Sequence, residues 1–225
     1  MRVRDLNWMQ LEAYLEHDDR LVLPLGSTEQ HAYLSLETDN SLAERVAVEA
    51  AEPLGLPVLP VLAYGVAPRF AAYPGSPSVS PETYVQLLSD LVASLRGQGF
   101  RRLLLVNGHG GNSFAAERVA ADGVRWHDWW RSVRVRTMVD EIDPEASHAS
   151  WMENFPWTRL AGVALPEGHK SAFDLSDVTD PAEFRRLAGD GSFGGFYERP
   201  DEEMLRIWEA AVQEVRTLLV SGWAS

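Results

Sequence analysis

Residues Leu103–Asn112 read LLLVNGHGGN, so four consecutive apolar side chains are followed at once by a glycine-rich polar turn. An earlier stretch, Leu21–Glu29, repeats the arrangement as LVLPLGSTE. Short apolar runs that end in glycine-containing polar segments are typical of buried strands in a parallel sheet. Ligand sites of such sheets gather at the carboxyl ends of the strands, which is where both polar segments fall.

Helical patterns alternate with these strands. Ser80 and Pro81 form a helix start, because serine caps a helix and proline suits its first position. We expect helices at Ser41–Pro53, Pro81–Gln98, Ser113–Trp126 and Glu202–Leu219, and further strands at Pro57–Val61 and Val133–Val139. This alternation predicts an α/β fold with a parallel or mixed sheet and helices on both faces. The length is ordinary for one α/β domain, so we interpret residues 1–225 as a single domain.

The composition excludes several classes of partner. The 225 residues carry a formal net charge of −13, which argues against nucleic acid or an anionic membrane surface as partner. Cysteine is absent, so His, Asp and Glu are the remaining strong metal ligands. The first residues lack the apolar stretch of a signal peptide, and no apolar run is long enough to span a bilayer. We expect a cytoplasmic protein.

Three polar residues after the first strand have the chemistry of metal ligands. Glu29 and His31 are two positions apart, so on an extended backbone both side chains point to the same side. Asp39 follows eight residues after His31. Two carboxylates and an imidazole suit zinc, manganese or iron(II), and an aspartate often bridges two such ions. The alternative is that Glu29 pairs locally, His31 is a surface residue and Asp39 caps the next helix. Spacing alone does not separate the two interpretations.

The other histidines differ in their surroundings. His109 lies between glycines that let the backbone turn sharply at the end of a buried strand, which favours a functional role over a plain turn. His148 and Glu153 lie in a stretch without clear periodicity and would, in isolation, be ordinary loop residues. We assign surface and packing roles to His17 and His127 and leave His169 open. The region 140–199 predicts loops rich in Pro, Gly, Trp and Phe, suited to lids or subunit contacts.

Several motifs, taken in order, resemble the creatininase (creatinine amidohydrolase) family. They are Leu23–His31, Thr38-Asp39, Tyr64–Val66, Tyr73–Gly75, Ser80–Tyr84 and Asn107–Asn112. The resemblance implies a three-layer α/β/α sandwich with a mostly parallel central sheet, often assembled as a hexamer. It also implies a metal-dependent amidohydrolase that cleaves a C–N bond of a small molecule at a site with two divalent metal ions. Zinc is the first expectation, with manganese or iron as alternatives.

The resemblance also implies roles for individual residues. Glu29, His31, Asp39 and His109 match the family's metal ligands. Glu153 matches more loosely as a fifth ligand, and His148 or Glu153 matches the proton-transfer group.

The chain departs from the family pattern at three places. Ala32 follows the ligand histidine where glycine is common, and Gly111 stands where creatininase itself has a glutamate. Phe155, with Trp151 and Trp157 nearby, replaces a Thr-Ser ending and suggests an aromatic-walled substrate pocket. Deformylation, peptide trimming and ring opening are rival reactions implied by other branches, and a non-catalytic metal-binding scaffold is a further alternative. Glu37 is interpreted as a solvated loop acid rather than a group that binds a cationic substrate.

Overall fold

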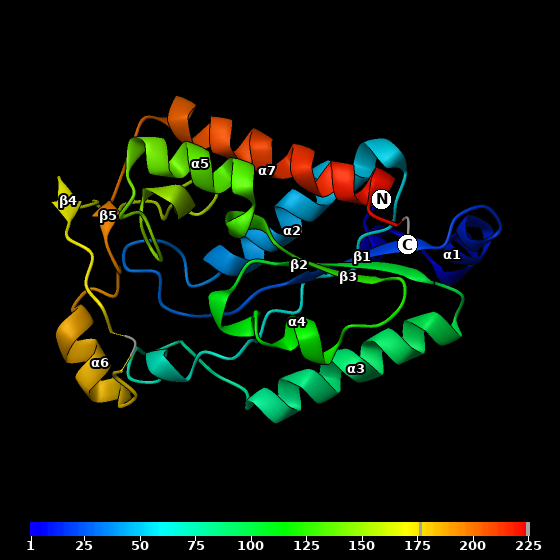
Figure 1. The fold of residues 1–225 in the computed structure, drawn as a ribbon, viewed down its shortest axis with the longest axis horizontal. Helices are drawn as coiled ribbons and strands as arrows, with labels where there is room; N and C mark the ends of the chain where they lie inside the picture. Colours follow the sequence, from blue (N-terminus) through cyan, green and yellow to red (C-terminus); the bar gives the residue numbers. More distant parts are fainter. Residues whose placement is uncertain (176, 224–225) are drawn as a thin grey trace.

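The computed structural model describes residues 1–175 and 177–223 and contains a parallel sheet at its centre (Figure 1). Strands β1 (Arg20–Leu25), β2 (Arg102–Asn107) and β3 (Val124–Asp128) pair in the order β1-β2-β3. Leu25 is opposite Asn107, which is opposite Asp128, so the three carboxyl ends are level. Residues 21–25 and 103–107 are buried, as expected of strands covered on both faces.

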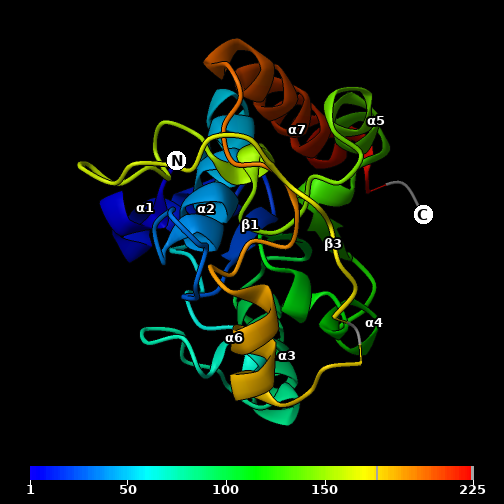
Figure 2. The ribbon, with the colours of Figure 1, turned by 90° about the vertical axis from the view of Figure 1, so that its left-hand side faces the viewer.

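Helices cover both faces of the sheet. Helices α2 (Thr38–Ala51), α5 (Val133–Ile142) and α7 (Asp201–Ser221) lie on one side, and α3 (Pro81–Gly97) and the short α4 (Ala115–Arg118) lie on the other (Figure 1). Figure 2 shows α5 and α7 at one end of the molecule and α3 with α6 (Pro181–Ala188) at the other. The predicted three-layer α/β/α sandwich is confirmed. None of the described helices combines the length and apolar character needed to cross a membrane.

The remaining elements are short. Helix α1 spans Trp8–Leu15, and strands β4 (His169–Lys170) and β5 (Gly195–Phe196) form an antiparallel pair. Single turns of 3-10 helix are η1 (Val3–Asp5), η2 (Glu52–Leu54), η3 (Pro68–Phe70), η4 (Gly110–Asn112), η5 (Trp129–Arg131) and η6 (Trp151–Glu153). The region 140–199 therefore contains a helix and a strand pair that its loop-like sequence did not predict.

The helices expected at Pro81–Gln98 and Glu202–Leu219 are confirmed. The helix expected at Ser41–Pro53 is also present, but it begins earlier, at Thr38, and ends at Ala51. The expected helix Ser113–Trp126 is wrong beyond Arg118, because Val124–Asp128 pairs with β2. Tertiary pairing there outweighs local helical preference.

The expected strand Val133–Val139 is also wrong, because the segment is helical. The Ser132 side chain accepts a hydrogen bond from the Val135 amide and caps α5. Val135 and Val139, four residues apart, are buried together on one helical face, whereas Val133 is exposed.

The expected strand Pro57–Val61 is only partly regular. Val58 forms isolated parallel bridges with Arg2 and Val22, and Leu62 forms one with Leu25, so the segment runs beside β1. Pro57 and Pro60 lack amide hydrogens, which prevents a continuous ladder.

Candidate metal centre

Five acidic and imidazole side chains meet at the carboxyl ends of β1 and β2. Glu29 and His31 lie on the loop after β1, Asp39 in the first turn of α2, His109 directly after β2, and Glu153 in η6. Each of them is buried. Gly108 permits this approach, because a Cβ there would come 2.5 Å from the Asp39 carbonyl oxygen. The structure thus brings together all five residues for which a ligand role was expected.

The five side chains form two groups that share Asp39. His109 Nδ1 lies 3.1 Å from Glu29 Oε2 and 3.0 Å from Asp39 Oδ2. The other Asp39 oxygen, Oδ1, lies 3.0 Å from His31 Nε2, which is 3.8 Å from Glu153 Oε2. One group is therefore Glu29, Asp39 and His109, and the other is His31, Asp39 and Glu153. A carboxylate that offers one oxygen to each group has the geometry to bridge two cations.

The hydrogen bonding of the polar atoms in this site indicates that the residues fit divalent cations. When each histidine carries its proton only on the nitrogen that faces a backbone carbonyl, both carboxylate oxygens of Glu29, the His31 Nε2 and the Asp39 Oδ2 are buried and have no hydrogen-bond partner among the described residues. Buried carboxylate oxygens without partners are costly, because they have left water without a replacement. Oxygen and imidazole donors of this kind match the preferences of zinc, manganese and iron. A pair of such ions would supply what the side chains lack.

Backbone carbonyls orient the two histidines. His31 Nδ1 lies 3.2 Å from the Glu29 carbonyl oxygen, and His109 Nε2 lies 3.1 Å from that of Val66. A carbonyl oxygen only accepts a hydrogen bond, so these two nitrogens carry the protons. The opposite nitrogens, which face the carboxylates, keep their lone pairs for a metal.

Protons take the place of cations when the site holds none. Burial alone would lower the pKa of His31, but the carboxylates of Asp39 and Glu153 outweigh it and raise the value to about 10. The pKa of His109 is also raised well above its ordinary value, because Glu29 and Asp39 outweigh the effect of burial. Burial raises the pKa of Glu153 to about 7. Metal uptake must therefore release protons from the two histidines.

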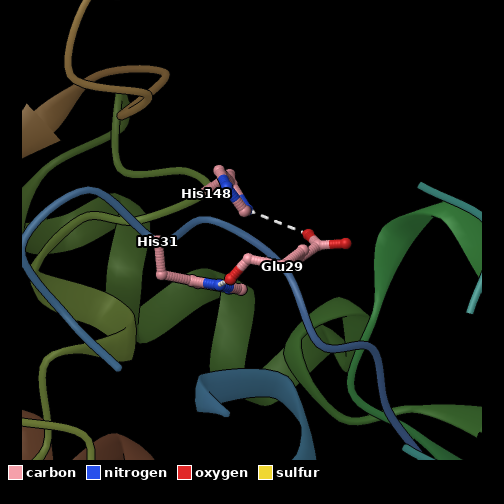
Figure 3. A group of neighbouring side chains, drawn as sticks. All are labelled: Glu29, His31 and His148. Carbon is pink, nitrogen blue, oxygen red and sulfur yellow. Dashed lines mark hydrogen bonds and ion pairs between the residues drawn. The ribbon is translucent and has the colours of Figure 1, made fainter. Parts of the chain in front are cut away.

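His148 lies over Glu29 and His31 (Figure 3). Its Nδ1 is 3.9 Å from Glu29 Oε1. Its Nε2 is 3.0 Å from the Gln30 carbonyl oxygen and 2.9 Å from the Gln30 side-chain nitrogen. Gln30 can therefore accept a hydrogen bond from a protonated Nε2 or donate one to an unprotonated Nε2. Burial, followed by the neighbouring His31, lowers the pKa of His148 well below its usual range, which keeps the imidazole neutral. His148 also lies close enough to Glu29 and His31 to be a ligand with them.

A cavity of about 730 Å³ opens above the candidate ligands. Its walls include the aromatic side chains of Phe70, Trp130 and Phe193. Phe70 stacks on the His148 ring at 5.0 Å, and Phe193 lies 4.7 Å from the same ring. An aromatic-walled pocket is therefore present, and Phe193 is the one of these three aromatic residues that comes from the region 140–199.

The expectation that Phe155, Trp151 and Trp157 wall the pocket is wrong. Trp151 and Phe155 are fully buried in the main core and do not line the cavity. Phe155 stacks on Trp157 at 5.0 Å, and both rings pack against Trp208 of α7. These aromatic side chains hold α7 against the segment that carries Glu153.

The remaining histidines lie away from this cavity. His17 contacts the Tyr14 ring, and His127 lies partly buried on β3. His169, left open by the sequence, lies 3.1 Å from Asp143 Oδ1. Gln30 was missed, because its contact with His148 joins positions 118 residues apart and leaves no trace in local sequence.

Comparison with known proteins places this geometry in context. The family model described as creatinine amidohydrolase matches residues 4–219. Creatinine amidohydrolase of Pseudomonas putida is 34% identical over 118 residues, which are 49% of this chain and 45% of that protein. Mycofactocin precursor peptide peptidase of Mycolicibacterium smegmatis is 36% identical over 99 residues, which are 41% of this chain and 40% of that protein. A 3-dehydro-scyllo-inosose hydrolase of Thermotoga maritima is 32% identical over 103 residues, which are 45% of this chain and 33% of that protein.

These alignments span less than half the length of the curated relatives. Solved structures match over more of the chain. A crystal structure of creatininase superposes with a TM-score of 0.83 at 24% identity, covering 100% of this chain and 98% of that one. A manganese form of creatininase gives a TM-score of 0.81 at 24% identity, covering 100% and 99%. At this identity the likeness establishes the fold, and the family model establishes the lineage: the chain belongs to the creatininase family.

Proposed function

We propose that the chain is a metal-dependent hydrolase that cleaves a C–N bond, an amide or a cyclic amide, in a small molecule. The observation that carries this proposal is the pair of ligand groups that share Asp39 at the base of the cavity. The names of the relatives support it, since they are an amidohydrolase, a peptidase and a hydrolase.

The proposed cofactor is a pair of divalent ions, zinc first and manganese or iron second. Glu29, Asp39 and His109 would hold one, and His31, Asp39 and Glu153 the other. Such ions supply a water whose pKa falls from about 15.7 towards 7, together with polarisation of the carbonyl oxygen. Solved creatininases of Zn-Zn and Mn types support this choice of metals.

His148 is the proposed proton carrier. It is neutral, lies beside the candidate ligands and lines the cavity, so it is able to accept a proton from the attacking water. The imidazolium formed would then donate that proton to the leaving nitrogen. Glu153 receives the Ala149 amide at 2.7 Å and faces His31, which suits a ligand better than a mobile proton donor.

The glycine turn after β2 is the proposed site for the developing oxyanion. Two of its amides are engaged in the fold, because Gly108 donates to the Leu25 carbonyl and Asn112 to the His109 carbonyl. Gly110 and Gly111 line the cavity at the start of η4, where the first amides of a helical turn lack intrahelical acceptors. We assign the oxyanion contact to these two residues.

Replacement of Asp39 tests the proposal. Asp39→Ala is expected to lose both bound metal, measured by mass spectrometry of the purified protein, and hydrolysis of amides in a substrate panel. Glu44→Ala is the control, since Glu44 lies on the same helix and pairs with Arg4 at the surface. Full activity of Asp39→Ala without metal would refute the proposed chemistry.

Two further proposals concern the whole chain. We propose that residues 1–225 act as one hydrolase domain, because ligands from both halves of the sequence meet in one site. We also propose a cytoplasmic homo-oligomer, a hexamer on the strength of the family resemblance. Sedimentation of the purified protein would measure the assembly.

A further inference from the structure

Residues 189–195, here called the strap, run from the end of α6 into β5 and reach His148 on the way. The Phe193 amide donates to the His148 carbonyl oxygen at 3.1 Å. The Phe193 ring lies 4.7 Å from the His148 imidazole, centre to centre. The strap therefore contacts both the backbone and the ring of the proposed proton carrier.

The buried Gln30 side chain connects the strap with a ring nitrogen of His148. Its Nε2 donates to the Gly191 carbonyl oxygen at 3.1 Å and lies 2.9 Å from His148 Nε2. Its Oε1 accepts a hydrogen bond from the Ala32 amide at 3.0 Å. Reversal of the side-chain amide would bring two N–H groups together at Ala32 and two carbonyl oxygens together at Gly191. These partners therefore fix the amide with its nitrogen towards the strap and His148.

Gly191 is the strap residue that makes room for Gln30. Its φ is 100°, a backbone conformation that side chains rarely adopt, and a Cβ at this position would collide with the Gln30 side-chain amide. The contact between Gln30 and the Gly191 carbonyl thus depends on the glycine. Any larger residue would push the amide away from both of its partners, the Gly191 carbonyl and His148.

The strap has anchors of its own, separate from the candidate ligands. Asp190 Oδ1 pairs with Lys170 Nζ at 2.5 Å, and Asp190 Oδ2 accepts a hydrogen bond from the Tyr197 hydroxyl at 2.7 Å. The Phe193 ring packs against Phe184 of α6 at 5.7 Å. The strap is therefore a fixed part of the fold against which the imidazole of His148 is held.

We propose that Gln30 is a positioning residue, which together with the strap holds the His148 imidazole with Nδ1 towards Glu29. This inference rests on the proposed hydrolase function, because the proton transfer assigned to His148 requires that orientation. Gln30 acts through His148 and not on the substrate, since the cavity lining formed by the described residues does not include it. Its loss should therefore lower kcat and leave KM unchanged, as expected when an interaction that matters only in the transition state is removed.

Gln30→Met tests the proposal, because methionine fills a similar volume but cannot donate to Gly191 or His148. With an amide that the unsubstituted protein hydrolyses, kcat should fall by about 10–100-fold, since misplacement of a reacting group by about 1 Å suffices for such a loss. KM and the bound metal, measured by mass spectrometry, should stay unchanged. Hydrogen exchange at residues 191–193 should become faster, which is a readout independent of turnover. Gln86→Met is the matched control, since Gln86 is exposed and donates to Asp90 on the same helix.

Gly191→Ala approaches the same contact from the strap and should also lower kcat while metal is retained. Its matched control is Gly168→Ala, because Gly168 has a φ of 94° and a Cβ there would meet no atom of the described residues within 4 Å. The double variant Gln30→Met/Gly191→Ala should lose no more activity than the single variants, since both remove one contact. Losses that multiply would show two independent effects and overturn the inference.

Two further outcomes would make the inference wrong. Loss of metal from Gln30→Met would mean that Gln30 supports the ligand loop instead of His148. An unchanged kcat in Gln30→Met with metal retained would show that the orientation of His148 does not depend on it. Failure of the hydrolase function looks different: the unsubstituted protein would turn over no amide, while Gln30→Met would still speed hydrogen exchange at residues 191–193.

Discussion

At the scale of single residues, His148 has the most unusual environment. It contacts the rings of Phe70 and Phe193 at 5.0 and 4.7 Å and the His31 ring at 4.4 Å, and one of its nitrogens is fixed by Gln30. Burial, followed by the neighbouring His31, keeps its pKa low. A histidine held in this way is neutral at pH 7 and ready to accept a proton.

His148→Gln tests this role. Glutamine retains a polar group of similar size but cannot carry a proton between water and the leaving nitrogen, so kcat should fall by about 10²–10⁴. The bound metal content should stay at the level of the unsubstituted protein. Loss of metal would instead make His148 a ligand, as its proximity to Glu29 and His31 allows, and an unchanged kcat would remove it from the reaction.

The sequence predicts which side chains meet at the candidate centre, but it does not predict their surroundings. Glu29 and His31 are two positions apart on one loop, and Asp39 starts the next helix, so local spacing already brings them near each other. The contact between Gln30 and His148 depends on how two distant loops pack, which no local pattern encodes. Ala32, directly after His31, adopts a φ of 50°, in the left-handed region that favours glycine, and its alanine side chain gives no local sign of this turn.

At the scale of elements, the crowding around η4 explains why position 111 is a glycine and not a glutamate. A Cβ on Gly111 would collide with the Val66 carbonyl oxygen and with His109 Nε2. That contact is the hydrogen bond that orients His109, so a side chain at this position requires a different path of the backbone. Glycine here is a condition for the His109 geometry rather than a simple loss of a ligand.

Gly111→Ala should therefore displace His109 and weaken metal binding by about 10–100-fold, the usual effect of losing a contact that orients a ligand. The matched control is Gly110→Ala, because a Cβ at Gly110 would meet only Trp130, at 4.0 Å. Competition with a chromogenic chelator measures both affinities. Equal metal affinity of the two variants would contradict this account of the turn.

Asp143 connects several short elements around the segment that carries Glu153. Its Oδ2 accepts hydrogen bonds from the Trp151 indole at 3.2 Å and from the Phe196 amide at 2.9 Å. Its Oδ1 faces His169 at 3.1 Å and accepts the Glu145 amide at 3.1 Å. Burial acts to raise the pKa of Asp143, but the hydrogen bonds from His169 and the two amides outweigh it and lower the pKa.

This lowered pKa predicts acid sensitivity. A carboxylate with a lower pKa in the folded state stabilises the fold above its unfolded pKa of about 3.9, and the contribution is lost as pH falls through the folded value. Asp143→Asn should cost about 2 kcal/mol of unfolding free energy at pH 7, and the difference from the unsubstituted protein should shrink below pH 4. Urea unfolding between pH 7 and pH 3 measures it, with exposed Asp122→Asn as control. A difference that stays constant with pH would rule out the ionised carboxylate as its source.

Element predictions failed where a segment's partner decided its conformation. Residues 133–139 alternate valine and arginine at their start, as a strand would, but the Ser132 cap and the core contacts of Val135 and Val139 make them helical. Residues 124–128 have no strong strand pattern and become β3 because the edge of β2 is available to them. The long amphipathic helices α3 and α7 were predicted correctly, since their periodicity extends over several turns.

At the scale of the whole molecule, the candidate centre joins parts of the chain that are far apart in sequence. Its ligands come from the β1–α2 loop and α2, from the end of β2, and from η6. Without cations the centre places three carboxylates, those of Glu29, Asp39 and Glu153, in one buried region. Metal binding would therefore both neutralise the repulsion and cross-link the two halves of the fold.

Removal of metal should consequently destabilise the whole protein. A ligand present at 100 times its Kd stabilises the folded state by about 2.7 kcal/mol, which for a chain of this size corresponds to about 5–10 °C in Tm. Differential scanning calorimetry of the zinc-loaded protein before and after treatment with a chelator should show this loss, and restored zinc should reverse it. Asp39→Ala should show no response to zinc, because the carboxylate shared by the two groups of candidate ligands is absent, whereas Glu44→Ala should respond fully. An equal Tm with and without metal would mean that the buried carboxylates are neutralised by protons on His31 and His109 as effectively as by cations, and the centre would then have no structural role.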